Sequence, residues 1–246
     1  MTPQTAIEPQ PAHKNAMARV IGEFTSPKET FADIGAKPTW LVPMLIIIVV
    51  QLVYLALVGQ HIGWKTVVGQ QMEKSSQTQN MSAEQKEQAI EQGAKFGAII
   101  GYVGVAVGVP LATAAMAGIL LGSMSLFGGK FSFMQSFGIV SHAGLIGIVS
   151  SVLAMIVMFA KPVEDFDIQN PLAFNLGAFL SADGTPKWLL SLAGSFDLFT
   201  FWSIALLATG YAAASGKLKF SKALTAVVLP WAVYVVLKVG WAAIRG

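Results

Sequence analysis

The sequence lacks cysteine and contains few charged residues. Without cysteine the chain has no disulfide, no thiolate nucleophile and no thiolate ligand for a metal. Only 12% of its 246 residues are charged, whereas a soluble domain has about 25%. Apolar residues make up 54% of the chain. This composition excludes an ordinary soluble domain and predicts a membrane protein.

Five apolar stretches reach the length of about 18 residues that a membrane-spanning helix needs. Backbone groups in hydrocarbon must form their hydrogen bonds within the segment, so all five are expected to be helices. The fold class predicted is therefore all-α, with a five-helix transmembrane domain over residues 41–246 and a polar extramembrane segment at 61–95. The expected spans are about 41–58, 97–127, 137–159, 188–214 and 224–244.

Residues 1–13, MTPQTAIEPQPAH, are rich in proline and glutamine, and we expect a disordered leader. No short apolar segment precedes a small-residue cleavage site, so the sequence predicts no cleavable signal peptide. The first span would then act as an uncleaved anchor.

Positive charge predicts the orientation of the spans, because Lys and Arg stay on the cytoplasmic side. The loop between the last two spans carries Lys217, Lys219 and Lys222 without an acid, and the preceding loop is mainly acidic. We expect a cytoplasmic N-terminus and an external C-terminus, in the inner membrane if the chain is bacterial. Four lysines between the first two spans argue against this orientation.

Residues 14–40 have the pattern of short amphipathic helices. Ser26, Pro27 and Glu29 suggest a capping box with proline in the first turn. We expect these helices to lie in the cytoplasmic membrane interface, with a tryptophan at the headgroup level. The alternative is a soluble helix pair packed on the loops. The expected interfacial anchors are Phe24, Ser26, Pro27, Phe31, Ile34 and Trp40.

The second span carries small residues at steps of three and four, including three G-x-x-x-G pairs. Such stripes let helices approach closely in lipid. Two interpretations are open, packing within the bundle or a homodimer seam, and Pro110 would kink the helix in either. The stripe consists of Gly97, Gly101, Gly104, Gly108, Ala112, Ala115, Gly118 and Gly122.

Charge inside a membrane is costly and suggests function. If the fourth span begins at Trp188, Asp197 lies below the outer surface and can pair with Lys238 of the neighbouring fifth span. If the span begins at Leu198, Asp197 instead lies at the helix N-terminus, where the helix dipole favours an acid.

Candidate catalytic groups fail on spacing. Ser141 and His142 are adjacent on a helix and point about 100° apart, so they do not form a nucleophile and base, and His142 is expected to pack between helices. The segment around Lys130 is no phosphate loop, because Met124 and Phe131 occupy the positions of its first glycine and its hydroxyl residue.

Glu164, Asp165 and Asp167 lack the glycine and the closing glutamate of a calcium loop, so we expect a solvated outer loop. The sequence predicts no enzyme, no cofactor, no metal site and no nucleic-acid partner.

The polar segment before the second span predicts a stalk. Ser82 and Gln85 form a capping box, and no proline follows before the membrane. We expect one helix from about Ala83 to Phe127, with SSQTQN before it as a hinge and the excess length available to a partner.

The N-terminal segment ARVIGEFTSPKETFADIGAKPTWLVPML resembles the signature of Yip1-domain membrane proteins, particularly their bacterial branch. The residues that carry the resemblance are Phe24, Ser26, Pro27, Phe31, Ile34, Pro38, Trp40 and Pro43. FGGKFSFMQSFGIVSHA, NPLAFNLGAFL and the segment from FDLFTFW onward resemble later parts of that family, so the likeness runs from about Arg19 to Leu237.

The resemblance implies five membrane helices and a cytoplasmic N-terminus. Eukaryotic relatives act in vesicle traffic and bind Rab GTPases through an N-terminal domain, whereas this chain has only about forty residues before its first span, so Rab binding is not carried over. We expect a non-enzymatic membrane protein that organises the bilayer or recruits a membrane-protein partner or a second copy. The alternative is a small-solute transporter or channel subunit.

Overall fold

A computed structural model describes residues 13–73, 78, 81–181 and 184–245 of the chain. Across these residues the protein is helical, and its only extended pairing is an isolated bridge between Asn175 and Asp197. Five helices are long and apolar enough to cross a membrane, which confirms the predicted fold class. They run over Leu41–Ile62, Ala83–Leu126, Phe133–Ala160, Leu198–Ser215 and Phe220–Ile244.

Several of these spans consist of more than one helical segment. The first is α3 (Leu41–Leu57) followed by a π-helical turn. The last two spans are single helices, α10 (Leu198–Ser215) and α11 (Phe220–Arg245). The third is α7 (Phe133–Ala143) followed after a turn by α8 (Ile146–Ala160).

Outside the spans, the described residues include four shorter α-helices and two complete 3-10 turns. Two of the helices precede the first span, one follows it, and one precedes the fourth span. They are α1 (Ala16–Thr25), α2 (Pro27–Ala36), α4 (Trp64–Glu73) and α9 (Lys187–Ala193), and the 3-10 turns are Val163–Asp165 and Leu176–Phe179.

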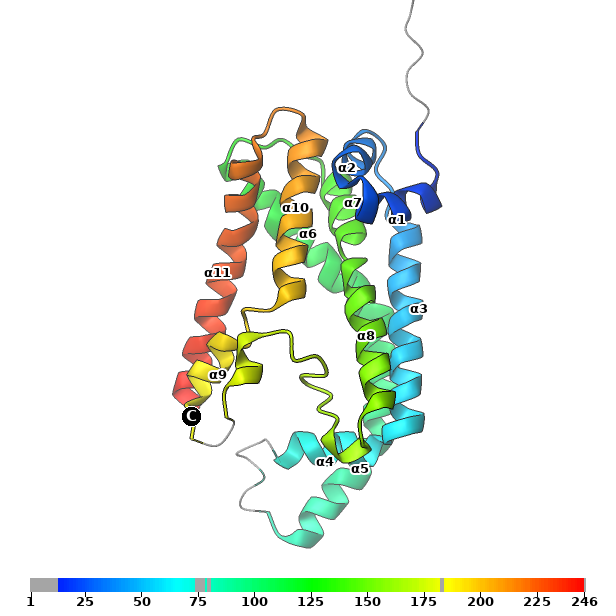
Figure 1. Cartoon of the computed structure of the whole chain (residues 1–246), viewed down its shortest axis with the longest axis vertical. Coiled ribbons are helices and arrows are strands. Elements are labelled where there is room, and N and C mark those ends of the chain that lie inside the picture. The colour runs from blue at the N-terminus through cyan, green and yellow to red at the C-terminus, as the bar shows by residue number, and fades with distance from the viewer. Residues whose placement is uncertain (1–12, 74–77, 79–80, 182–183, 246) are drawn as a thin grey trace, which may run out of the picture.

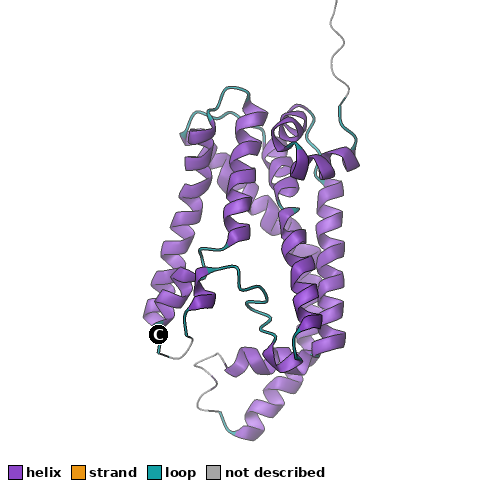
Figure 2. Cartoon of the chain, viewed as in Figure 1, coloured by secondary structure: helices purple, strands orange, loops and turns teal. Residues whose placement is uncertain are grey.

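The helices form an elongated bundle, and its two ends differ in the elements they hold (Figure 1). One end, here called the α1–α2 end, holds α1, α2 and the α10–α11 loop. The other, the α4 end, holds α4, the start of the second span and the C-terminal end of α11. Figure 2 shows the long connection from α8 to α10, mostly loop, crossing the space between the two groups of helices.

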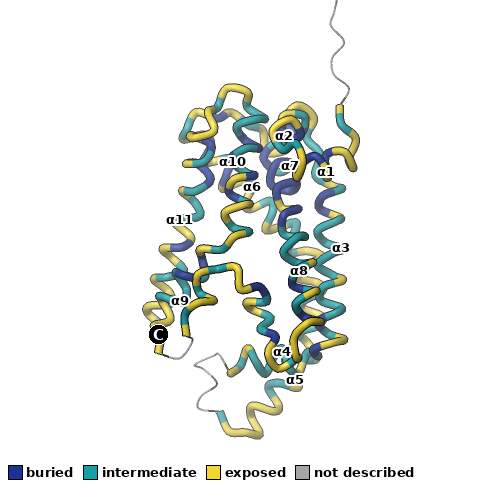
Figure 3. The backbone as a smooth tube through the Cα atoms, in the orientation of Figure 1, coloured by how far each residue is buried: buried dark blue, intermediate teal, exposed yellow. Residues whose placement is uncertain are grey.

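Burial is concentrated at the α1–α2 end, as Figure 3 shows along the backbone. There Phe31 and Ile34 of α2 join a core contributed by α6, α7, α10 and α11. A smaller core at the α4 end contains Val58, Ile62, Met158 and Phe166. Most other apolar side chains of the spans are exposed, such as Leu111 at 65% and Val236 at 70%, which is the surface that a lipid-embedded bundle presents.

The fourth span begins at Leu198 and not at Trp188, so the expected boundaries 188–214 are wrong at the N-terminal side. The Asp197 side chain caps α10 by accepting hydrogen bonds from the backbone N–H groups of Phe199 (2.9 Å) and Thr200 (3.1 Å). Trp188 belongs to the separate helix α9. A strong N-cap starts a helix at a defined residue, which hydropathy does not locate.

The second span is one uninterrupted helical run of 44 residues, Ala83–Leu126, as predicted. It consists of α5 (Ala83–Val103), a π-helical turn (Gly104–Gly108) and α6 (Val109–Leu126). At 1.5 Å per residue its length is about 66 Å, against a hydrocarbon thickness of about 30 Å.

The polar part of this helix is not a lone stalk, because α4 packs along it. Lys65 of α4 donates to Glu91 of α5 at 2.9 Å, and Val68 lies against Gly93. The predicted SSQTQN hinge lies, except for Thr78, outside the described residues.

Candidate functional site

Helix α1 has its polar and apolar faces reversed relative to an ordinary surface helix. It buries Arg19 and Glu23, at 2% and 1% exposed, while Met17 and Ile21 are 58% and 57% exposed. A surface helix of a soluble protein buries its apolar stripe instead. The polar side of α1 therefore faces the protein, and its apolar side is available to lipid.

Arg19 joins α1 to the end of α2 and to the loop that enters the first span. Its Nε donates to Asp33 Oδ2 at 2.8 Å, and its Nη1 donates to the Lys37 carbonyl at 2.9 Å and to Thr39 Oγ1 at 2.6 Å. A planar guanidinium with several fixed donors suits such a junction.

The acidic partner of this arginine receives further hydrogen bonds. Asp33 Oδ1 lies 2.7 Å from His13 Nδ1, and Oδ2 also accepts the Lys14 backbone N–H at 3.2 Å. Burial raises the pKa of Asp33, but hydrogen bonds from His13 and Arg19 and the charge of Arg19 outweigh it, so the pKa lies below its ordinary value. Asp33 is therefore ionised and balances the charge of Arg19.

A second carboxyl, Glu23, meets an imidazole from the bundle. Glu23 Oε1 is hydrogen-bonded to His142 Nδ1 on α7, and His142 Nε2 lies 3.3 Å from Thr39 Oγ1. Both side chains are 1% exposed. Glu23 Oε2 is buried without a hydrogen-bond partner among the described residues.

The protonation of Glu23 follows from this burial. Burial raises the pKa of the Glu23 carboxyl from 4.5 to about 9, so at neutral pH the pair holds a proton. A protonated Glu23 donates to Nδ1, which leaves the other ring nitrogen to donate to Thr39. The partnerless oxygen is then the carbonyl of a neutral acid, which costs less to bury than a carboxylate oxygen.

Close backbone contact places α2 over this site. A Cβ at Gly35 would lie 2.5 Å from Ala214 Cβ and 2.7 Å from Ala214 Cα, so α2 crosses α10 at a distance that only glycine permits. The Gln135 side-chain amide also donates to the Gly35 carbonyl at 2.8 Å.

The expected interfacial anchors differ in where the structure places them. Phe31 and Ile34 are 0% exposed in the protein core, so their assignment as membrane anchors is wrong. Ser26 makes no side-chain cap, against the predicted capping box, and instead accepts a 3.4 Å hydrogen bond from Lys14 Nζ. Phe24 is 42% exposed and its interfacial role stays a prediction.

Pro27 and Trp40 are the other two expected interfacial anchors. Pro27 is the first residue of α2, and Trp40 precedes α3 with its ring 5.3 Å from the ring of Phe137. Trp40 therefore has a protein partner at the start of the first span.

Of the two alternatives for Asp197, the position at the helix N-terminus is confirmed and the membrane charge pair with Lys238 is wrong. Asp197 caps α10, whereas Lys238 Nζ donates to Ser195 Oγ at 3.1 Å and to the Ser191 carbonyl at 3.4 Å. Lys238 thus joins α11 to α9 and to the turn that follows it. The pair required a fourth span beginning at Trp188, and the Asp197 cap removes that geometry.

The small-residue stripe packs within the bundle only over its first part. A Cβ at Gly101 would meet Leu55 at 3.5 Å, and one at Gly97 would meet Val68 at 3.9 Å. A Cβ at Gly104, Gly108, Gly118 or Gly122 would meet no atom of the described residues within 4 Å. Ala112 and Ala115 are exposed as well. Packing within the bundle is therefore wrong for the part beyond Gly101, because the neighbouring helices contact other sides of α6.

The sequence interpretation missed Arg19, Glu23 and Asp33 as site residues. Arg19 and Glu23 are spaced i,i+4 and suggest a solvated helix face, which is the usual arrangement. His142 could have indicated this site from the sequence, because an ionisable residue inside a span normally has a buried polar partner.

The contacts of this site can hold α1 in position and can bind a proton. Ser141 Oγ donates to the Phe137 carbonyl of its own helix at 2.7 Å. Its hydroxyl hydrogen is therefore not directed at His142, as it would be in a pair of nucleophile and base. Among the described residues no three His, Cys, Asp or Glu side chains gather as metal ligands.

Two comparisons with known proteins gave a match. A family model described as "Yip1 domain" matches residues 21–242. The chain is also 27% identical over 231 residues to "Membrane protein YknW" of Bacillus subtilis (strain 168), an alignment that covers 92% of this chain and 91% of that protein. No solved structure matches.

Proposed function

Because the chain belongs to the Yip1 domain family, we propose that it is a non-enzymatic membrane protein whose N-terminal helices organise the cytoplasmic membrane surface and recruit a protein partner. The observation that carries this proposal is the reversed burial of α1. Its polar side is tied to the bundle through Arg19 and Glu23, and Met17, Ile21 and Phe24 face outward. A helix held in this way is an interfacial element built into the membrane domain.

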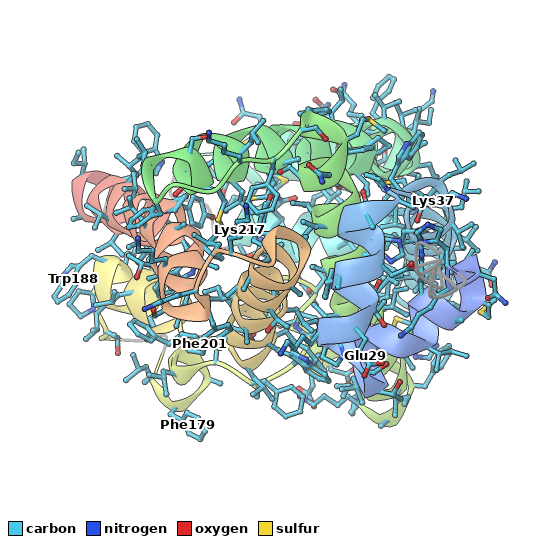
Figure 4. The ribbon with its side chains drawn as sticks, turned by 90° about the horizontal axis from the view of Figure 1, so that it is seen from above. Glu29, Lys37, Phe179, Trp188, Phe201 and Lys217 are labelled. Carbon is cyan, nitrogen blue, oxygen red and sulfur yellow. The ribbon has the colours of Figure 1, made fainter. Side chains whose placement is uncertain are left out.

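Charge supports a cytoplasmic location for this end. Figure 4, seen from above, shows Lys37 and Lys217 there on different elements. The exposed lysines at this end lie on α2 and its C-cap, in the α6–α7 and α10–α11 connections and in the first turn of α11. They are Lys28, Lys37, Lys130, Lys217, Lys219 and Lys222. Such clusters favour the anionic cytoplasmic leaflet.

A spin label tests the interfacial placement of α1. The chain has no cysteine, so Ile21→Cys gives a single labelling site on its apolar side. In proteoliposomes we expect the label on this introduced thiol to be relaxed by oxygen, which partitions into lipid, more than by a water-soluble nickel complex.

Glu29→Cys, on the exposed polar side of α2, is the matched control and should show the opposite preference. Equal exposure of both labels to the nickel complex would contradict the interfacial placement.

Two kinds of protein partner are compatible with this function. A second copy would use the exposed part of the small-residue stripe, and a different membrane protein would use the α4–α5 segment. Co-purification in mild detergent distinguishes them, because only the second gives another polypeptide.

A transporter or channel subunit is the alternative function and predicts solute flux in proteoliposomes. Two polar groups that a path would need, Asp197 and Lys238, are engaged in hydrogen bonds to neighbouring residues.

A further inference from the structure

The Glu23–His142 contact joins two parts of the chain that are 119 residues apart. Glu23 lies on α1, outside the spans, and His142 lies on α7, within the third span. Thr39 contacts both His142 and Arg19, so the two buried polar pairs meet at one hydroxyl. Separation of α1 from the bundle must break the contacts of Glu23 with His142 and of Arg19 with Thr39.

Burial favours the protonated form of the Glu23 carboxyl in the docked state. A carboxylate at this place would be 1% exposed, with one oxygen bearing no partner among the described residues. Its other oxygen would have a donor in the imidazole only when the hydrogen is on Nδ1. Once separated from the bundle, the carboxyl is hydrated and ionises at its ordinary pKa.

We propose that docking of α1 onto the bundle binds one proton at the Glu23–His142 pair, so that α1 loosens from the bundle as the pH rises. This makes the pair a proton-binding site that controls whether the polar side of α1 is covered. This docking equilibrium is a property of the chain by itself and needs no partner protein.

The charged groups around the pair do not supply a second acceptor for the proton. Arg19 of α1 and Asp33 of α2 form an ion pair at 2.8 Å. His13 and the Lys14 backbone are bonded to Asp33, and the Lys14 ammonium is bonded to Thr30 at 3.0 Å and lies 3.9 Å from Glu29. Helices α10 and α3, which pack on α2 and α7, carry no charged side chain.

The sign of the pH dependence follows from the pKa of Glu23. Undocked, the carboxyl has its ordinary pKa of 4.5, and docked it has a pKa of about 9. A pKa raised by docking stabilises the docked state fully below about pH 4.5, and this stabilisation is lost as the pH rises through about 9. An imidazole exposed by undocking is itself neutral only above about pH 7. Between about pH 7 and 9 the docking equilibrium therefore falls about tenfold per pH unit, because undocking releases one proton from Glu23.

A buried thiol reports undocking in this cysteine-free chain. Thr30 is 0% exposed and faces α1, where a Cβ at Gly22 would overlap Thr30 Oγ1. The thiol of a Thr30→Cys variant therefore reacts with a maleimide only when α1 lifts away. The thiol of an Ala32→Cys variant, exposed on the same helix, measures the reagent's own pH dependence, because only the thiolate reacts.

We expect the labelling rate of Thr30→Cys, divided by that of Ala32→Cys, to rise about tenfold per unit between about pH 7 and pH 8.5. Adding Glu23→Gln should make this ratio independent of pH, because the amide still donates to His142 but does not titrate. Glu29→Gln, which changes an exposed carboxyl that is 78% accessible, should leave the slope unchanged.

A Ser123→Cys variant, with its thiol buried between α6 and α11, should stay slow to label throughout and so show that the bundle remains closed. If Glu23→Gln opens the bundle by this measure, Glu23→Leu replaces it as the variant that does not titrate. A flat ratio with Glu23 intact, or an equal slope without it, would overturn the proposal.

Discussion

Arg19 and Asp33 show how much depends on single polar residues at the α1–α2 end. Arg19 is 2% exposed, yet the hydrogen bonds of its side chain reach Asp33, Lys37 and Thr39, all outside α1. A buried ion pair contributes little net stability compared with apolar residues, but loss of one partner leaves the other charge uncompensated. The arginine therefore specifies where α1 lies, and its removal should be costly.

Arg19→Met should destabilise the folded protein by about 3 kcal/mol, because Asp33 loses its guanidinium partner in a site that is 14% exposed. Thermal unfolding in detergent measures this change. Lys28→Met is the control, since Lys28 is an exposed cation on α2, and it should change stability by less than about 0.5 kcal/mol. Equal effects of the two substitutions would show that Arg19 acts only through net charge.

At the scale of elements, glycine decides which helices touch. Helix α2 reaches α10 at Gly35, and α10 receives Phe31 at Gly210, where a Cβ would lie 3.1 Å from the Phe31 ring. In contrast, Gly118 and Gly122 on α6 face away from the rest of the chain. Glycines that look alike in the sequence therefore have opposite roles.

Gly35→Ala and Gly118→Ala form a matched pair of substitutions. The first places a methyl group 2.7 Å from a backbone atom of Ala214 and should destabilise the protein by about 2 kcal/mol through overpacking. The second meets nothing within 4 Å and should be neutral or stabilising by up to about 1 kcal/mol, because alanine favours helix. Unfolding in detergent gives both values, and a neutral Gly35→Ala would contradict the close crossing of α2 and α10.

At the scale of the whole molecule, the spans are held together mainly at one end. The larger core joins α2, α6, α7, α10 and α11 at the α1–α2 end, and the smaller core joins the first span and α8 at the other. The connection after α8 is fastened to the start of α10 by Leu176 N–H to the Phe196 carbonyl and Leu198 N–H to the Phe174 carbonyl. Non-helical backbone at membrane depth needs such internal partners.

Five spans place the two ends of the chain on opposite sides of the membrane. With the lysine-rich α1–α2 end in the cytoplasm, alkaline phosphatase fused after Gly246 should be active in a bacterial host, because that enzyme folds only outside the cytoplasm. A fusion after Lys130, in the α6–α7 connection, is the control and should be inactive. The reverse pattern would invert the predicted orientation.

The sequence by itself determined the features that depend on neighbouring residues. Five apolar runs required five helices, and the capping box of Ser82 and Gln85 forms as predicted, with hydrogen bonds of 2.9 and 3.2 Å. The continuous second span followed from the lack of a helix breaker outside the membrane. Local hydrogen bonding and hydropathy suffice for such features because their partners lie within a few residues.

Only the tertiary structure decided which polar residues are buried. Glu23 and Arg19 have the spacing of a solvated helix face, and they become a site because α1 turns that face toward His142 and Thr39. Phe31 and Ile34 have the spacing of a membrane anchor, and they are core because α2 crosses α10. A helix's own pattern distinguishes its two faces, but the elements that dock against it determine which face meets protein and which meets lipid.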